Sequence, residues 1–272
     1  MMLNYPTIDP IAFHIGSWPV YWYGLMYLIG FLGGWSVLSL RLRFSPYDRG
    51  FKQEEVSDIV FYAALGAIIG GRLGYMLFYG WQTLLANPLL LFQTWKGGMS
   101  FHGGLLGVLI ALFLCARKLK KPILALTDLI APAVPIGLGA GRIGNFINDE
   151  LWGRVTTMPW GMVFPKADAY PRHPSQLYEF FLEGIVLFCI LWLYSRKPRP
   201  LAAVSGLFAI CYGLFRCMVE FFREPDAPIG YIAFGWLTEG QLLSLPLILV
   251  GIILMVWAYQ HKKASTSHEA IS

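Results

Sequence analysis

Seven long apolar stretches constrain this chain more than any other feature of its sequence. A helix needs about 20 mostly apolar residues to cross the hydrocarbon layer of a membrane, and each stretch comes close to that length. They run approximately over 19–40, 57–79, 99–116, 123–147, 176–194, 203–221 and 240–259. Because lipid offers the backbone no hydrogen-bond partner, these stretches are expected to be helical. The sequence therefore predicts an all-α membrane protein, a bundle of about seven transmembrane helices.

The composition points to the same class. Hydrophobic residues make up 56% of the chain and charged residues 14%, with a mean hydropathy of +0.55, which excludes an ordinary soluble domain. We expect a single integral membrane domain over residues 1–272, with four short segments on the N-terminal side of the membrane. These segments lie approximately at 1–18, 80–98, 148–175 and 223–239.

Lysine and arginine predict the orientation, because short loops rich in positive charge stay cytoplasmic. Thirteen flank one side of the membrane: Arg41, Arg43, Arg49, Lys52, Arg117, Lys118, Lys120, Lys121, Arg196, Lys197, Arg199, Lys262 and Lys263. Five flank the other side: Lys96, Arg154, Lys166, Arg172 and Arg223. With seven spans, the N-terminus is predicted outside and the C-terminus in the cytoplasm. The net charge of +5 then reflects topology and requires no nucleic-acid partner.

Three arginines lie deep inside apolar stretches: Arg72, Arg142 and Arg216. A charge near the bilayer centre costs about 2.5–3.5 kcal/mol on insertion scales, so it needs a partner or a function. Arg216 precedes Glu220 by four residues, within reach of an ion pair on one helix, and the two could simply neutralise each other. Arg72 and Arg142 have no such local partner, which favours a functional interpretation: the guanidinium groups serve an anion and are not cancelled by carboxylates.

Two glutamates open the fifth apolar stretch. Glu179 lies in its first turns, where a carboxylate complements the helix dipole. Glu183 lies one turn deeper and is a candidate partner for an arginine of another span.

Glycines accompany these charges. Gly139 to Gly144 match the spacing of a dinucleotide-binding fingerprint, but that motif has meaning only between a strand and a helix, so we reject it here. The glycines instead allow close helix approach or leave room for a ligand beside Arg142. Asn145, Asn148 and Glu150 add amide and carboxylate groups at the outer end of the same stretch.

Two further glycine patterns stand on the second and third stretches. Gly66, Gly70 and Gly74 have the four-residue spacing of tightly packed helices, so their expected role is structural. Glycine pairs also bracket His102. A lone histidine in such a place is commonly only packed, yet the glycines would leave its imidazole uncrowded, and neutral histidine is a good proton acceptor near pH 7.

Five motifs, in this order, resemble those of the bacterial prolipoprotein diacylglyceryl transferases. They are Trp22 to Tyr27, Gly98 to Gly104, Gly141 to Asn148, His173 to Glu179, and Phe215 to Arg223. The resemblance covers nearly the whole chain. It implies a multi-pass enzyme of the bacterial inner membrane with a periplasmic N-terminus, which agrees with the orientation derived from charge.

The same resemblance implies an activity and a set of site residues. The diacylglyceryl group of phosphatidylglycerol would pass to the lipobox cysteine thiol in the signal peptide of a prolipoprotein, giving a thioether and glycerol 1-phosphate. The implied catalytic residues are Tyr23, His102, Arg142, Asn145, Glu150 and Arg216. The implied substrate-binding residues are Arg142, Gly153, Tyr212, Arg216, Glu220 and Arg223.

These residues support a mechanism in outline. Arginine holds phosphate with two parallel hydrogen bonds and stays charged in a dry site, so Arg142 and Arg216 are the expected phosphate ligands. His102 is the candidate base for the thiol, although an electropositive site could lower the thiol pKa and make a base dispensable. Tyr23 either donates a hydrogen bond to the head group or only anchors the chain at the interface.

No cofactor or metal is expected, because the five histidines lie far apart without ligand spacing. The alternative function is a membrane transporter or channel for an anionic substrate, since buried charges and glycine-interrupted helices would suit it too. The lack of a visible internal repeat argues against that alternative.

Overall fold

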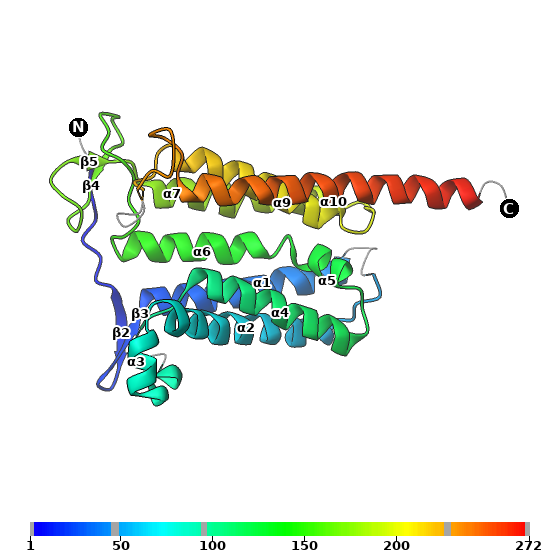
Figure 1. The fold of residues 1–272 in the computed structure, drawn as a ribbon, viewed down its shortest axis with the longest axis horizontal. Helices are drawn as coiled ribbons and strands as arrows, with labels where there is room; N and C mark the ends of the chain where they lie inside the picture. The colour runs from blue at the N-terminus through cyan, green and yellow to red at the C-terminus, as the bar shows by residue number, and fades with distance from the viewer. Residues whose placement is uncertain (1–2, 45–48, 94–96, 226–229, 270–272) are drawn as a thin grey trace. The chain divides into compact units, whose positions relative to one another are not determined.

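The computed structural model describes residues 3–44, 49–93, 97–225 and 230–269, with side chains described as far as His261 (Figure 1). Lys96 and the side chains of Lys262 and Lys263, which were used to predict the orientation, lie outside these described parts. Within them the chain is mostly helical.

Among the described residues, six helices are long and apolar enough to cross a membrane, and a bent helix pair makes a seventh if it is counted as one span. The spans are α1 (Trp22–Phe44), α2 (Glu55–Phe78), α4 (Phe101–Leu119), the bent pair α5 (Ile123–Ile130) and α6 (Val134–Ile147), the run α7 (Ser175–Glu179), η3 (Phe180–Val186) and α8 (Leu187–Ser195), then α9 (Ala203–Glu220) and α10 (Glu239–Glu269). The predicted helical membrane fold is confirmed. The orientation and the single domain over 1–272 stay predictions.

Two spans are irregular in ways that hydropathy did not predict. The pair α5 and α6 bends by 52°, at a break followed by Pro135 in the first turn of α6, where proline is tolerated. The fifth span contains a π-helical segment, η3, which carries Glu183 and Gly184.

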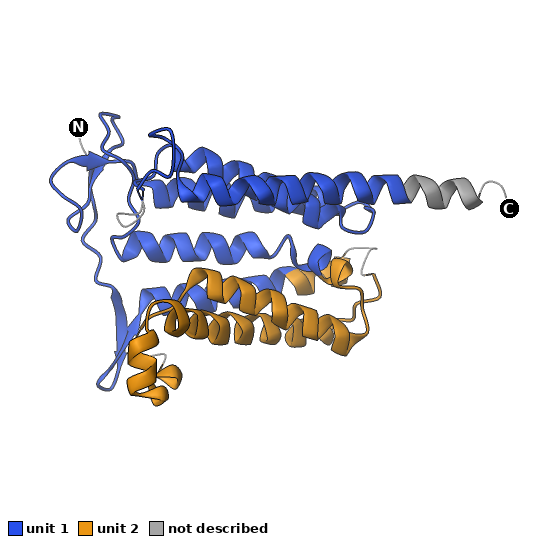
Figure 2. Cartoon of the chain, in the orientation of Figure 1, with its two compact units in different colours: residues 1–37, 127–272 blue, residues 38–126 orange. Residues whose placement is uncertain are grey.

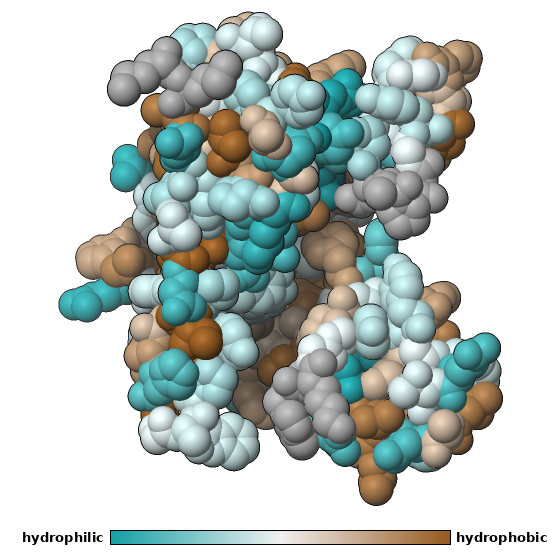
Figure 3. All heavy atoms as spheres, turned by 90° about the vertical axis from the view of Figure 1, so that its left-hand side faces the viewer, coloured by the Kyte–Doolittle hydropathy of each residue, from teal (hydrophilic) through white to brown (hydrophobic). Residues whose placement is uncertain are grey.

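Short strands and helices fill the segments between spans. They are β1 (Leu3–Asn4), β2 (Ile11–Ile15), β3 (Trp18–Tyr21), α3 (Trp81–Ala86), η1 (Pro88–Phe92), β4 (Met162–Val163) and β5 (Pro171–Arg172). β1 pairs with β4 in parallel, and β4 with β5 antiparallel. Figure 3 looks onto the face that carries these strands, where hydrophilic side chains gather among hydrophobic ones.

The start of the first predicted span is a strand and not a helix. Ile15 pairs with Trp18 across a two-residue turn, and Gly16 in this turn has a φ of +60°. Glycine adopts this left-handed conformation at no steric cost, as two-residue hairpins require. Residues 19–21 therefore belong to β3, and α1 begins at Trp22.

The spans expose apolar side chains on their outer faces. Leu109 of α4 is 52% exposed and Ile253 of α10 is 64% exposed. Such side chains would face water at a large free-energy cost but face lipid at none. The exposure pattern fits helices that contact lipid.

The chain divides into two compact units, residues 1–37 with 127–272, and residues 38–126 (Figure 2). In the second unit, α2 packs against α4 through glycines. A Cβ on Gly66 would lie 2.5 Å from the Gly107 carbonyl oxygen, and one on Gly74 would lie 2.7 Å from the Gly103 Cα. The predicted packing role of Gly66, Gly70 and Gly74 is confirmed.

Arg72 belongs to this second unit and is tied to neutral backbone groups. Its guanidinium donates hydrogen bonds to five carbonyls that follow α2: those of Leu90, Leu91, Gln93, Gly97 and Gly98. The residue is buried. Arg72 thus has a structural role, holding the segment between α2 and α4 together, and the functional interpretation favoured for it is wrong.

The first unit has its core where the fifth and sixth spans meet. Leu187 and Leu191 of α8 pack with Val204 of α9 and with Ala131, which lies between α5 and α6. Nearby, the buried Asp128 accepts hydrogen bonds from the backbone of Ala202 (2.9 Å) and Ser205 (2.8 Å). These bonds satisfy backbone donors at the start of α9, and so they fix where that helix begins.

Candidate active site

A network of three arginines and three glutamates lies within the first unit. Arg142 comes from α6, Glu179 from α7, Glu183 from η3, and Arg216 and Glu220 from α9, while Arg223 follows α9. Three positive and three negative formal charges sum to zero. All six side chains meet through segments that are far apart in the sequence.

Glu179 occupies the centre of this network. Its side chain is 0% exposed, and its Oε2 lies 3.1 Å from Arg142 Nε. Its Oε1 accepts a hydrogen bond from Arg216 and lies 3.8 Å from Arg223 Nη1. A carboxylate without solvent is tolerable only when paired in this way, so Glu179 organises the arginines around it.

Glu220 has both arginine partners and a hydrogen-bond donor. It forms an ion pair with Arg216 on the same helix, as its spacing predicted, and lies 3.8 Å from Arg223 Nη1. Thr238 Oγ1 donates a 2.7 Å hydrogen bond to Glu220 Oε2. Tyr212, one turn before Arg216, lies within electrostatic range of Arg142 and Glu183.

Glu183 has the weakest contacts of the three glutamates in the network. Its Oε2 lies 3.5 Å from Arg142 Nη2, and neither of its carboxylate oxygens has a hydrogen-bond partner among the residues that the structure describes. Its side chain is nevertheless 0% exposed. It is carried by the π-helical segment, and such segments occur frequently at functional sites.

Glycines bring these charged groups together. A Cβ on Gly184 would lie 3.0 Å from the Gly139 Cα, so both glycines are needed for α6 to approach η3. A Cβ on Gly141, beside Arg142, would meet no atom within 4 Å in the described structure. Close packing thus applies at Gly139, while room for a ligand beside Arg142 stays a prediction.

A second polar cluster joins α1 to the end of α6. Asn145 Nδ2 donates a 2.8 Å hydrogen bond to Glu150 Oε1, and the Tyr23 hydroxyl lies within hydrogen-bonding reach of the Asn145 side chain. A Cβ on Gly144 would lie 2.9 Å from Cδ2 of the Tyr23 ring, so this glycine makes room for the tyrosine.

Gly153 lies where three backbone segments cross. Its N–H donates to the His173 carbonyl at 2.8 Å, and a Cβ at this position would lie 2.6 Å from the same oxygen. Next to it, Arg154 Nε donates to the Arg223 carbonyl at 2.9 Å and Nη2 to the Glu220 carbonyl at 3.2 Å. This crossing fixes the end of α9, which carries Glu220 and leads into Arg223.

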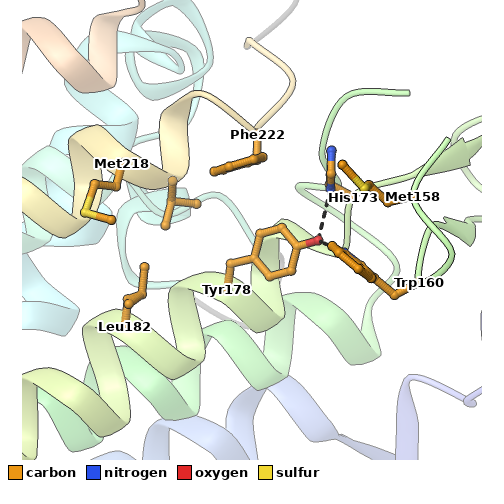
Figure 4. A pocket seen from close by; sticks show the side chains of 8 residues that line it. Met158, Trp160, His173, Tyr178, Leu182, Met218 and Phe222 are labelled. Atoms are coloured by element: carbon orange, nitrogen blue, oxygen red, sulfur yellow. Dashed lines mark hydrogen bonds between the residues drawn. The ribbon is translucent and has the colours of Figure 1, made fainter. Parts of the chain in front are cut away.

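An apolar cavity of about 290 Å³ lies between the α7–η3 segment and the end of α9 (Figure 4). Its lining is Met158, Trp160, His173, Tyr178, Leu182, Met218, Val219 and Phe222. Tyr178 Oη accepts a 2.7 Å hydrogen bond from Trp160 Nε1 and lies 3.0 Å from His173 Nδ1. Burial lowers the pKa of His173, because the charged imidazolium loses hydration there.

A model of the family described as prolipoprotein diacylglyceryl transferase matches residues 10–257 of the chain. The chain belongs to this family. Among its relatives are proteins named phosphatidylglycerol–prolipoprotein diacylglyceryl transferase. The one from Pseudomonas aeruginosa strain PAO1 is 59% identical over 263 residues, 97% of this chain and 98% of the relative. The one from Coxiella burnetii strain RSA 331 is 59% identical over 262 residues, 96% of this chain and all of the relative.

The expectation that Arg142 has no carboxylate partner is wrong. The guanidinium groups of Arg142 and Arg216 do have carboxylate partners, so Arg142 is not the isolated charge that its local sequence suggested. The predicted partnership of Glu183 with an arginine of another span is confirmed. The arginines are not sealed off, since the side chains of Arg142 and Arg216 are 17% and 14% exposed.

The family histidine, His102, belongs to the second unit, whereas the residues of the network belong to the first. It stands in the first turn of α4, where Ser100 Oγ caps the helix by accepting from the Gly103 N–H at 3.2 Å. The side chain is exposed. The neighbouring Gly103 packs against α2, so helix packing explains that glycine without reference to the imidazole. A base role for His102 stays a prediction.

Sequence reasoning overlooked the importance of Glu179, which was interpreted as a partner for a helix dipole. The signal that could have revealed it is its four-residue spacing from Glu183, which places two carboxylates on one side of the fifth span. Thr238, the hydrogen-bond partner of Glu220, carried no such signal. No group of three or more potential metal ligands occurs among the described residues, and the absence of a metal or cofactor stays a prediction.

Proposed function

We propose that this chain is an inner-membrane enzyme that transfers the diacylglyceryl group of phosphatidylglycerol to the cysteine thiol of a prolipoprotein. Membership of the transferase family and the names of relatives at 59% identity support this activity. The observation that carries the proposal is the network of buried glutamates and partly buried arginines, in which Arg142 and Arg216 keep an exposed edge.

The phosphate group of the lipid binds at that edge. The cysteine sulfur attacks the glyceryl carbon, the bond from this carbon to the phosphate oxygen breaks, and glycerol phosphate leaves with the electron pair. Arg142 and Arg216 stabilise the charge that grows on the leaving phosphate, because preorganised guanidinium donors are most effective where water is excluded. The thiol hydrogen leaves as a proton, and His102 is the proposed acceptor.

The other site residues position the substrates. Tyr23, Asn145 and Glu150 form one hydrogen-bonded cluster, and we assign them to orientation of the head group. Tyr212, Glu220 and Arg223 belong to the network itself and hold its arginines in place, while Gly153 supports the lipid site by letting three segments cross closely. Together they account for all the residues implied by the family motifs.

A reconstituted reaction tests the proposal. Purified full-length protein is incubated with phosphatidylglycerol and a peptide that bears Leu-Ala-Gly-Cys. The expected products are glycerol phosphate and a peptide whose mass has risen by one diacylglyceryl group. A peptide with serine in place of cysteine is the control and should yield neither product. Failure of the cysteine peptide under conditions where the protein is folded would reject the function.

A further inference from the structure

The arginine network contains no spare charge for an anion. Its three arginines are balanced by Glu179, Glu183 and Glu220. A lipid phosphodiester carries one negative charge, so its arrival would leave the buried cluster with one uncompensated negative charge. Such a charge is strongly unfavourable away from water.

The three carboxylates differ in how firmly they are held. Glu179 lies against Arg142, Arg216 and Arg223. Glu220 combines ion pairs with a hydrogen bond from Thr238. Within the described structure, Glu183 has a single ion pair, at 3.5 Å to Arg142, and no hydrogen bond. Glu183 is therefore the carboxylate that an incoming anion displaces most easily.

A displaced Glu183 remains inside the protein. It is carried by η3, its side chain is 0% exposed, and Gly184 holds this segment close to Gly139 of α6. The charged and titratable groups that face it are Arg142 from α6, Arg216 and Tyr212 from α9, and Glu179 from α7. When Arg142 contacts a phosphate instead, Glu183 loses its ion pair and stays beside the carboxylate of Glu179. Binding one proton then removes the uncompensated negative charge of Glu183.

We propose that the lipid phosphate replaces Glu183 on Arg142 and that Glu183 binds one proton when this happens. The proposal rests on the proposed function, because it assumes that Arg142 holds the phosphate. Lipid binding is then coupled to the uptake of one proton, and the occupied cluster is again neutral. When the product phosphate leaves, Glu183 returns to Arg142 and releases its proton.

Calorimetry measures this coupling directly. Purified full-length protein in neutral detergent is titrated with a short-chain phosphatidylglycerol, in buffers of different ionisation enthalpy, at several pH values. The dependence of the binding heat on the buffer gives the number of protons taken up, which is expected to be about one. The Kd should rise about tenfold per pH unit over the range in which the proton is taken up on binding.

Three variants identify the group that binds the proton. Glu183→Gln resembles the protonated acid, so its proton uptake should vanish and its Kd should stay constant with pH. Glu183→Asp keeps a carboxylate and should keep the uptake. Glu224→Gln is the matched control, because Glu224 pairs with Arg172 outside the network, and it should behave like the unsubstituted protein.

The outcomes separate the two proposals. Lipid binding with no proton uptake by the unsubstituted protein, or uptake that persists in Glu183→Gln, would overturn the role of Glu183 and leave the phosphate site intact. Absence of lipid binding at every pH in folded protein would instead reject the phosphate site on Arg142. Uptake that is lost only in Glu183→Gln supports the proposal.

Discussion

Arginines within membrane spans occur in both units of this protein, and their partners are of opposite kinds. Arg72 donates to backbone carbonyls that cannot titrate or leave. Arg142 and Arg216 contact carboxylates that can exchange partners or bind a proton. The comparison teaches that a charge inside a membrane span identifies a functional site only when its partners are themselves able to change.

The largest expected effect comes from replacing the planar guanidinium group of Arg142 while keeping its positive charge. Lysine offers a point charge and cannot make two parallel hydrogen bonds. Arg142→Lys should lower kcat by about 10²–10³-fold, as for the loss of one preorganised donor, with expression unchanged. The measurement is glycerol phosphate release by purified protein. Unchanged turnover would show that Arg142 does not hold the phosphate, and the contrast between Arg142 and Arg72 would then fail.

Arg72→Met should act on stability and not on chemistry. Its partly buried carbonyl partners would lose their donor, and one unsatisfied buried group costs about 1–3 kcal/mol. We expect the free energy of unfolding to fall by about 3 kcal/mol, measured by denaturant titration in detergent, with kcat per folded molecule within about twofold of the unsubstituted value. A folded but inactive variant would show that Arg72 takes part in the reaction.

Tyr23→Phe removes one hydroxyl and leaves the ring that packs on Gly144. If the hydroxyl contacts the head group, loss of one hydrogen bond of about 1 kcal/mol should raise KM or lower kcat by about fivefold. Steady-state kinetics with varied lipid concentration separates the two effects. If Tyr23 is only an interfacial anchor, the variant would have normal kinetics.

The smallest effect concerns His173 beside the apolar cavity. Its pKa is lowered in the folded state by burial, so the unfolded chain binds protons more readily. Stability is full above the ordinary histidine pKa of about 6.5 and declines as the pH falls from there toward the lower folded pKa. His173→Gln should flatten this decline slightly in melting temperatures measured between pH 5 and pH 8, about the range where histidine titrates. An unaltered pH profile would contradict this role.

The two kinds of arginine could not be distinguished from the sequence. Arg216 and Glu220 were predictable as a pair, since four residues span one helical turn. The acceptors of Arg72 lie 18 to 26 residues later, between the spans α2 and α4, and those of Arg142 lie on the fifth span. Pairing at such separations depends on how helices pack, so Arg142 looked isolated when it was not.

The sequence by itself determined the membrane class, about seven spans and their approximate limits, because hydrophobic length is a property of each stretch alone. It also determined the family, through motifs that keep their order along the chain. Only the tertiary structure decided that Glu179 lies among three arginines, that Glu183 is loosely held on a π-helical segment, and that residues 19–21 form a strand. The physical reason is that pairing of buried charges depends on which helix faces meet, and this is set by packing across the whole unit and not by any local pattern.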